Sequence, residues 1–237
     1  MKNQLISIIL PIHNQADHIR SVITEYEEKL SVLPLQYEIL LVLNGCRDDS
    51  LAVCQDLKNK FSSVRIIETK RSGWGLAVKL GIKEARGDVF CYTNSSRTQA
   101  KDLILFLLYA LANPETVIKA NRKIRESLTR RIGSLLYNIE CRTLFDLTYW
   151  DINGTPKVFP RKYDKLLQLS REDDLIDLEF NLLCRQAEYP ILEIPTFSPK
   201  RSGGKSTTRM GSALKMYWGA LKMKLDYDRR EKAKGPA

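Results

Sequence analysis

Residues 87–99 read Gly-Asp-Val-Phe-Cys-Tyr-Thr-Asn-Ser-Ser-Arg-Thr-Gln, and this stretch decides the fold. Val89 to Tyr92 is a short apolar run of strand-forming residues, which predicts a buried strand. Small polar residues from Thr93 to Ser96 follow it directly. Ligands of open α/β sheets bind at the carboxyl ends of parallel strands, so we expect these polar side chains to lie at a binding site.

A glycine-rich turn and a helix precede that strand. Gly73 and Gly75 stand where the helix is expected to begin, and the helical pattern closes at Gly87. Glycine lets the backbone approach a ligand closely, and the N-terminus of a helix attracts anions. This turn is therefore a second candidate for ligand binding.

Three further apolar runs, at 5–10, 37–43 and 64–68, have the pattern of buried strands. Helical patterns at 16–30 and 49–60 separate them. Strands that alternate with helices in this way predict an α/β fold with a parallel, doubly wound sheet.

The length of 237 residues and the 43% share of hydrophobic residues allow one large domain. We expect that domain to span 1–210 and a basic amphipathic tail to span 211–237. Five scattered cysteines without Cys-x-x-Cys spacing favour reduced packing residues over a disulfide framework or a zinc site. No signal-peptide pattern is visible, and the longest apolar run, 103–112, is far below the roughly 20 residues that span a bilayer. We therefore expect a cytoplasmic protein.

The order of these motifs resembles the family-2 glycosyltransferases of the GT-A fold, especially the branch that makes polyprenyl-phosphate sugars. The resemblance is carried by Gly73, Gly75, Ala77, Gly81, Ala85, Gly87 and Asp88, and it extends from about Leu5 to Arg209. It implies a mostly parallel, Rossmann-like sheet with helices on both faces. It also implies transfer of a hexose from a nucleotide-sugar donor to a lipid-phosphate or other membrane-associated acceptor.

The family's metal motif is altered in this chain. Its Asp-x-Asp holds a divalent metal on the donor's diphosphate, and here the two aspartate positions are Asn94 and Ser96. An amide and a hydroxyl are neutral ligands, whereas Mg²⁺ and Mn²⁺ prefer charged carboxylates. We therefore assign no metal ligand and expect weak or absent Mg²⁺ or Mn²⁺ dependence. The alternative is a metal held by other residues, such as Asp88 or Asp151.

The resemblance implies that several loops contact the donor. These nucleotide-binding candidates are Pro11, His13, Asn14, Asn44, Asp48, Gly73, Gly75, Asn94 and Ser96. The alternative for Asn14 and Asp48 is that they only cap helices, and for Asn44 that it only forms a tight turn.

The resemblance also implies residues that act on phosphate and acceptor. Phosphate-binding candidates are Lys157, Arg201, Lys205 and Arg209, and the catalytic candidates are Asp151, Asp177 and Glu179. The carboxylates would accept a hydroxyl or act as a base, and the cations would stabilise the leaving diphosphate. Acidic residues from 172 to 174 are expected in the first turn of a helix that begins at Arg171.

A net charge of +10 predicts an acidic partner. Residues 121–137 and 212–234 both have basic amphipathic patterns, the first with its apolar positions at Ile124, Leu128, Ile132 and Leu135. Such helices lie on anionic membranes, although most are only solvated faces of a globular fold. No nucleic-acid motif is present, so we expect no nucleic-acid partner and favour a peripheral position at the inner membrane face.

A second functional class stays open. The altered metal motif also fits a catalytically silent, glycosyltransferase-like module that binds a nucleotide or serves as a scaffold. Nucleotide binding without turnover would favour that module. The sequence does not identify the sugar, the nucleotide, the acceptor or the oligomeric state.

Overall fold

The computed structural model describes residues 4–123, 128–197 and 210–234. Its described strands form one sheet in the order β3-β2-β1-β4-β6-β5-β7. The strands are β1 (Leu5–Ile12), β2 (Gln36–Asn44), β3 (Val64–Thr69), β4 (Val89–Tyr92), β5 (Val117–Arg122), β6 (Lys157–Pro160) and β7 (Ile191–Thr196). The helices are α1 (Ile19–Leu30), α2 (Ser50–Lys60), α3 (Trp74–Glu84), α4 (Ala100–Ala112), α5 (Leu128–Phe145), α6 (Asp164–Leu167), α7 (Ile176–Gln186) and α8 (Met210–Lys234).

The sheet is mostly parallel, as the sequence predicts. β1 pairs in parallel with β2 and β4, β2 with β3, and β5 with β7, whereas β6 is antiparallel to β4 and β5. β1 and β2 are buried along almost their whole length, because helices cover both faces of the sheet. Continuous apolar runs such as Ile39 to Leu43 follow from that double cover.

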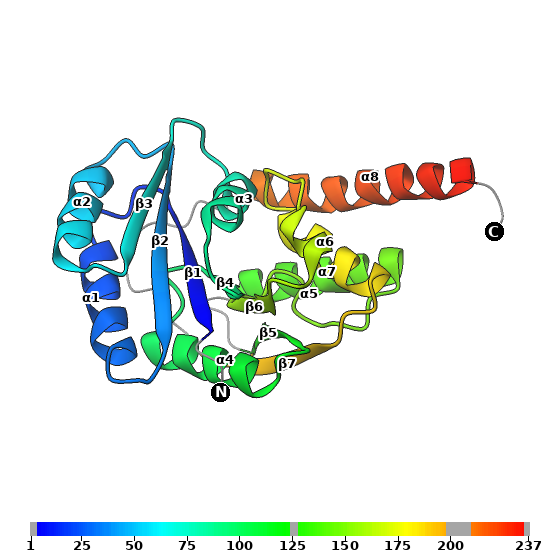
Figure 1. Ribbon diagram of the computed structural model, residues 1–237. Coiled ribbons are helices and arrows are strands. Elements are labelled where there is room, and N and C mark those ends of the chain that lie inside the picture. Colours follow the sequence, from blue (N-terminus) through cyan, green and yellow to red (C-terminus); the bar gives the residue numbers. More distant parts are fainter. Residues whose placement is uncertain (1–3, 124–127, 198–209, 235–237) are drawn as a thin grey trace.

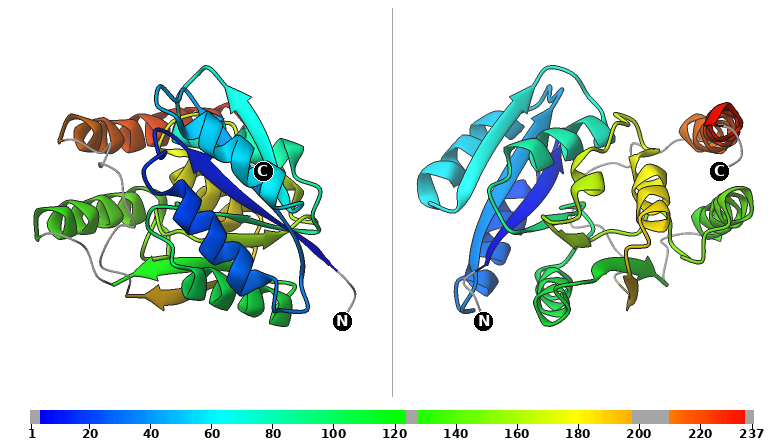
Figure 2. Two further views of the ribbon diagram at one scale, coloured as in Figure 1. Left: turned by 90° about the vertical axis from the view of Figure 1, so that its left-hand side faces the viewer. Right: turned by 45° about the vertical axis from the view of Figure 1, so that its right-hand side comes forward.

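Two apolar layers hold the helices on the sheet. On one face, α1, α2 and α4 pack through residues such as Tyr26, Leu57 and Phe106. On the other face, α3, α6 and α7 pack through residues such as Val78 and Phe180. Figure 2 shows the helices on the two sides of the twisted sheet, which is the GT-A-like arrangement that the sequence predicts.

A third apolar cluster joins α5, α7 and α8. Tyr137 and Cys141 of α5 pack with Leu178 of α7 and Ala220 of α8. The rings of Tyr137 and Tyr217 meet edge to face at 5.6 Å, and the Tyr217 hydroxyl donates to the carbonyl of Gly133 at 2.6 Å. In Figure 1, α5 and α8 extend away from the sheet on the side opposite α1 and α2.

The prediction for the basic stretch 121–137 is wrong at both ends, whereas the helix predicted for the tail is confirmed. Residues 117–122 form β5, so the basic stretch 121–137 is not helical at its start. In the described part of the chain its helix is α5, from Leu128 to Phe145. Arg122 stays extended because it continues the pairing with β7 opposite Thr196. The expected tail helix at 212–234 is confirmed as α8. Among the described residues, no helix combines the length and apolar character that crossing a bilayer requires.

Candidate functional site

Asn44 joins three of the loops that sequence reasoning assigned to the donor. Its side-chain Nδ2 donates to the carbonyl of Ile12 at 2.8 Å, and its Oδ1 accepts from the amide of Gly73 at 3.1 Å. The carbonyl of Asn44 lies 2.7 Å from His13 Nδ1. The ends of β1 and β2 and the start of α3 therefore meet at one point of the carboxyl edge. Asn44 is only 4% exposed, so its side chain is committed to the backbone.

Asn14 and Asp48 hold the first two loops together. Asn14 has a left-handed backbone with φ of 51°, and its Oδ1 accepts from the amide of Arg47 at 2.8 Å. Asp48 accepts from the amide of Ala16 at 3.0 Å and from the hydroxyl of Ser50 at 2.6 Å. Partial burial opposes ionisation of Asp48, but these hydrogen bonds outweigh it and lower its pKa. Asn14 therefore joins two loops and does not cap α1, whereas Asp48 also accepts from the amide of Ser50 at the start of α2, at 3.1 Å.

Gly73 and Gly75 permit a close approach of the segment 171–173. A Cβ on Gly73 would lie 2.6 Å from the carbonyl oxygen of Glu172, and one on Gly75 would lie 2.6 Å from that of Asp173. The amide of Leu76 donates to the same Glu172 carbonyl at 3.0 Å. These glycines are needed for protein packing, and their contact with a ligand stays a prediction.

The acidic run 172–174 does not begin a helix, because α7 starts only at Ile176. The expectation of a first turn there is wrong. The segment instead lies against α3, where the carbonyls of Glu172 and Asp173 face the glycines.

In the turn that replaces Asp-x-Asp, the side chains of Asn94 and Ser96 bind each other. Asn94 Oδ1 accepts from the amide of Ser96 at 3.1 Å and from its hydroxyl at 2.7 Å. The hydroxyl of Ser95 donates to Gln15 Oε1 at 2.6 Å, which ties the turn to the loop after β1. Ser95 and Ser96 are both buried.

The described residues do not fit a divalent metal of the family type. They contain no group of three or more His, Cys, Asp or Glu side chains that could hold an ion. Asp88 precedes β4 and accepts from the amide of Leu5 at 3.1 Å, so it lies at the amino edge of the sheet, opposite Asn94. Asp151 makes a two-point ion pair with Arg122, at 2.7 and 2.8 Å.

Asp177 is the centre of a buried cluster beneath the glycine turn. It accepts from the hydroxyl of Tyr92 at 3.0 Å and from Trp74 Nε1 at 3.1 Å, and it forms an ion pair with Lys157. Lys157 is fully buried and also donates to the carbonyl of Ile152 at 3.1 Å. Burial lowers the pKa of Lys157 to about 8, although the charge of Asp177 opposes that shift.

The other two catalytic candidates are also engaged. Asp151 is 2% exposed and, besides the Arg122 guanidinium, accepts from the Arg122 amide at 2.9 Å. Glu179 accepts from the amides of Ser170 at 3.0 Å and Arg171 at 2.9 Å, and so fixes the loop before α7. All three carboxylates therefore have protein donors.

Three of the four predicted phosphate-binding cations, Arg201, Lys205 and Arg209, lie outside the described residues. The fourth, Lys157, is buried in the cluster around Asp177.

The model of the family described as "Glycosyl transferase family 2" matches residues 7–166, which is more than half of the chain. The chain belongs to glycosyl transferase family 2. This family-2 chain is 28% identical over 120 residues to a dolichol-phosphate mannosyltransferase of Pyrococcus furiosus, covering 51% of this chain and 34% of the relative. It is 27% identical over 205 residues to an undecaprenyl-phosphate 4-deoxy-4-formamido-L-arabinose transferase of Pseudomonas fluorescens, covering 85% and 59%. The family-2 chain thus spans between a third and three fifths of these curated relatives.

Solved structures share the fold of this family-2 chain. Glucosyl-3-phosphoglycerate synthase from Mycobacterium tuberculosis, in complex with Mn²⁺, uridine diphosphate and glucosyl-3-phosphoglycerate, matches with a TM-score of 0.66 at 16% identity. The match covers 92% of this chain and 77% of that one. The GT-A fold predicted from the sequence is confirmed.

The sequence did not indicate three side chains of the candidate site in this family-2 chain. Trp74 and Tyr92 bind Asp177, and Arg122 binds Asp151. Trp74 and Asp177 are 103 residues apart in the chain, so no local pattern could pair them. Their positions in the chain could have suggested them, because Trp74 directly follows the candidate Gly73 and Tyr92 is the last residue of β4.

Proposed function

We propose that this chain transfers a sugar from a nucleotide-sugar donor to a lipid-phosphate acceptor. The observation that carries the proposal is the meeting of the β1 loop, the β2 loop and the start of α3 at Asn44, in a chain of glycosyl transferase family 2. Ligands of open α/β sheets bind at this edge. The names of the relatives, which act on dolichol phosphate and undecaprenyl phosphate, support a polyprenyl phosphate as the acceptor class.

In this proposal the donor lies over the loops after β1, β2 and β4. His13 and Asn14 offer the nucleotide a half-buried imidazole and an exposed amide, whereas Asn44 shapes the site through the backbone. Pro11, Asp48, Gly73, Gly75, Asn94 and Ser96 remain the other proposed lining positions. The diphosphate would be stabilised by Arg201, Lys205 and Arg209, which replace the charge that a metal would supply.

Roles on the acceptor side follow the contacts of the three carboxylates. We assign Asp177 and Lys157 to positioning, because both are buried and bound to each other. Glu179 is half-buried and Asp151 is paired with Arg122, so a base role for either requires that its present donors be exchanged for a sugar or phosphate group.

The proposed place of action is the cytoplasmic face of an anionic membrane, where lipid phosphates present their headgroups. The positive net charge supports this choice. We also propose the division into a glycosyltransferase-like domain at 1–210 and a basic tail at 211–237, because the described part of the tail lies in one long helix, α8.

A product assay tests the proposed activity. UDP- and GDP-sugars with radiolabelled hexose are incubated with polyprenyl phosphate in detergent, and the glycolipid is separated by solvent extraction. Sugar in the organic phase that depends on both protein and lipid phosphate supports transfer. If calorimetry shows nucleotide binding but no donor gives product, the silent module is favoured. The hydrogen bonds between Asn94 and Ser96 also support that module.

A further inference from the structure

Helix α5 has large apolar side chains on two opposite sides. Tyr137, Cys141 and Phe145 are buried in the core. At 100° per residue, the opposite side carries Leu128, Ile132, Leu135, Leu136 and Ile139, which are between 47% and 70% exposed and which we call the α5 stripe. A surface helix ordinarily places polar residues on that side, so the α5 stripe is a departure that packing does not explain.

Helix α8 repeats this departure. Ala220 is fully buried against the body, whereas Leu214, Trp218 and Leu225 are 68%, 72% and 52% exposed. With the partly exposed Leu221 they follow one another at intervals of four, three and four residues, which places them on one side of the helix as the α8 stripe.

Basic residues border the α8 stripe. Lys215, Lys222 and Arg229 are exposed and recur every seven residues, so they form a row along one edge of the stripe. Over its whole length, α8 contains seven basic and three acidic residues.

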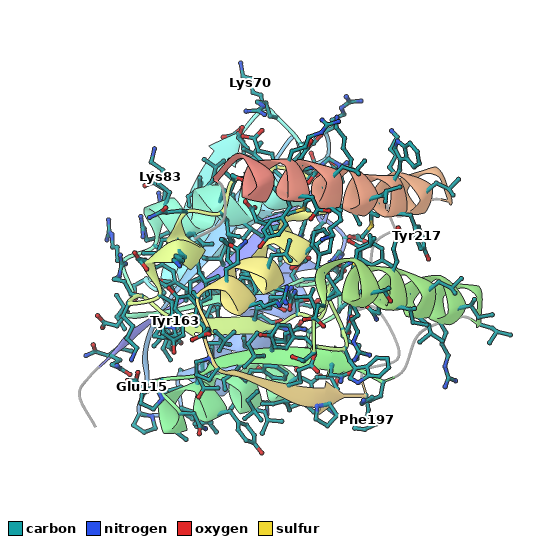
Figure 3. The ribbon with its side chains drawn as sticks, turned by 90° about the vertical axis from the view of Figure 1, so that its right-hand side faces the viewer. Lys70, Lys83, Glu115, Tyr163, Phe197 and Tyr217 are labelled. Atoms are coloured by element: carbon teal, nitrogen blue, oxygen red, sulfur yellow. The ribbon has the colours of Figure 1, made fainter. Side chains whose placement is uncertain are left out.

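The two helices form one projecting unit. Tyr217 of α8 lies between them in Figure 3, consistent with its hydrogen bond to Gly133 of α5. Together the two stripes expose eight large apolar residues that are at least 47% accessible. Within each helix the stripe residues follow one another closely enough to form a row, and exposed apolar surface with a polar border marks an interaction site.

We propose that the α5 and α8 stripes insert into the acyl region of an anionic lipid membrane, while Lys215, Lys222 and Arg229 bind the headgroup phosphates. This inference specifies the membrane-facing surface of the proposed function and rests on that function only for its biological purpose. Aliphatic residues enter the hydrocarbon boundary, and tryptophan favours the headgroup level. A second copy fits less well, because its α8 would bring the same excess of positive charge to the same border.

Vesicle flotation of the full chain, without any nucleotide sugar, tests the surface directly. Phosphatidylcholine vesicles with and without phosphatidylglycerol are compared for the wild type and for the double substitution Leu135→Ser with Ile139→Ser. The positions are exposed, so the fold should persist. Loss of two inserted aliphatic side chains should lower the partition coefficient by about tenfold or more.

Matched controls separate the stripes from general hydrophobicity and charge. Val32→Ser and Leu108→Ser remove exposed aliphatic residues elsewhere, on the loop after α1 and on α4, and should bind as the wild type does. Lys215→Gln with Lys222→Gln should weaken binding to anionic vesicles by about fivefold per charge. Lys58→Gln with Lys83→Gln, on α2 and α3, should not.

Tryptophan fluorescence reports the depth of insertion. The chain has three tryptophans. Quenching of the fluorescence by brominated acyl chains should be lost in Trp218→Phe, although that variant keeps the other two tryptophans. Equal vesicle binding by stripe variants and wild type would overturn the proposal. So would a dimer, seen by sedimentation, that the stripe variants abolish in a chain that binds no vesicles. Absence of sugar transfer with intact stripe-dependent binding would refute the proposed activity alone.

Discussion

Replacing Asn44 tests whether the candidate site depends on one buried amide. In Asn44→Ala, the Ile12 carbonyl loses its 2.8 Å donor and the Gly73 amide loses its 3.1 Å acceptor. Each buried polar group left without a partner costs about 1–3 kcal/mol, so for the two groups we expect a loss of about 2–6 kcal/mol in the free energy of unfolding. The weak contact from Cys46 Sγ to the same Ile12 carbonyl, at 3.4 Å, places the effect toward the lower end.

Asn44→Asp separates the two hydrogen bonds. The introduced carboxylate can still accept from Gly73, but it has no proton to donate to Ile12 and would repel that carbonyl. Burial should raise its pKa in the folded chain above the unfolded value of about 3.9. The destabilisation should therefore be full above the folded pKa and should shrink as the pH falls through it.

Urea denaturation of both variants between neutral and acidic pH measures these effects. Asn113→Asp is the matched control, since it removes a 2.8 Å amide-to-carbonyl bond at an exposed helix end and should cost less than about 1 kcal/mol. Hydrogen exchange at the Gly73 amide should accelerate in Asn44→Ala more than in Asn44→Asp. An Asn44→Asp chain that is as stable as the wild type at neutral pH would contradict the assigned role of the Ile12 hydrogen bond.

Three further predictions concern the metal, the buried lysine and the glycine turn. In calorimetry with a nucleoside diphosphate, EDTA should leave the affinity unchanged and Lys205→Ala should reduce it by about tenfold; the opposite pattern would show a metal held by other ligands. Lys157 has a folded pKa of about 8, below its unfolded value, so the unfolded chain binds more protons between about pH 8 and 10. As the pH rises through that interval, the wild type should gain up to about 3 kcal/mol of unfolding free energy relative to Lys157→Met. If urea denaturation gives a difference that does not change with pH, the assigned burial of Lys157 is contradicted. In Gly75→Ala the added Cβ would lie 2.6 Å from the Asp173 carbonyl oxygen, so the free energy of unfolding should fall by about 1–3 kcal/mol. Gly133→Ala is the control: no atom lies within 4 Å of the added Cβ, so it should be neutral or stabilising by up to about 1 kcal/mol. An equal loss of unfolding free energy in the two variants would show that segment 171–173 does not contact Gly75.

The elements that could be predicted are those whose signal is local. The runs 5–10 and 37–43 are apolar because β1 and β2 are covered on both sides, and that pattern is visible in the chain itself. Arg122 shows the opposite case, since its basic neighbours suggested a helix, whereas pairing with β7 and with Asp151 keeps it at the end of a strand. A contact with residues far away in the chain decided its conformation, and no periodicity records such a contact.

The site candidates show the same division. Family position brought His13, Asn44 and Gly73 together correctly at one edge of the sheet. Residue type was a poorer guide to chemical availability, because Asp151 and Asp177 have the oxygen atoms of a base but are bound to Arg122 and Lys157. Whether a carboxylate is free depends on which cation the fold places beside it.

The amides at this edge of the sheet have a chemical consequence. Asn44 donates to Ile12 and accepts from Gly73, and an ionised aspartate could make only the second bond. Gln15 accepts from Ser95 while its nitrogen lies 3.4 Å from the Pro11 carbonyl, again using both halves of an amide. Both amides are therefore built into the contacts that shape the loops. Since Asn44, Gln15, Asn94 and Ser96 carry no charge, we expect lysine and arginine side chains to neutralise a bound diphosphate.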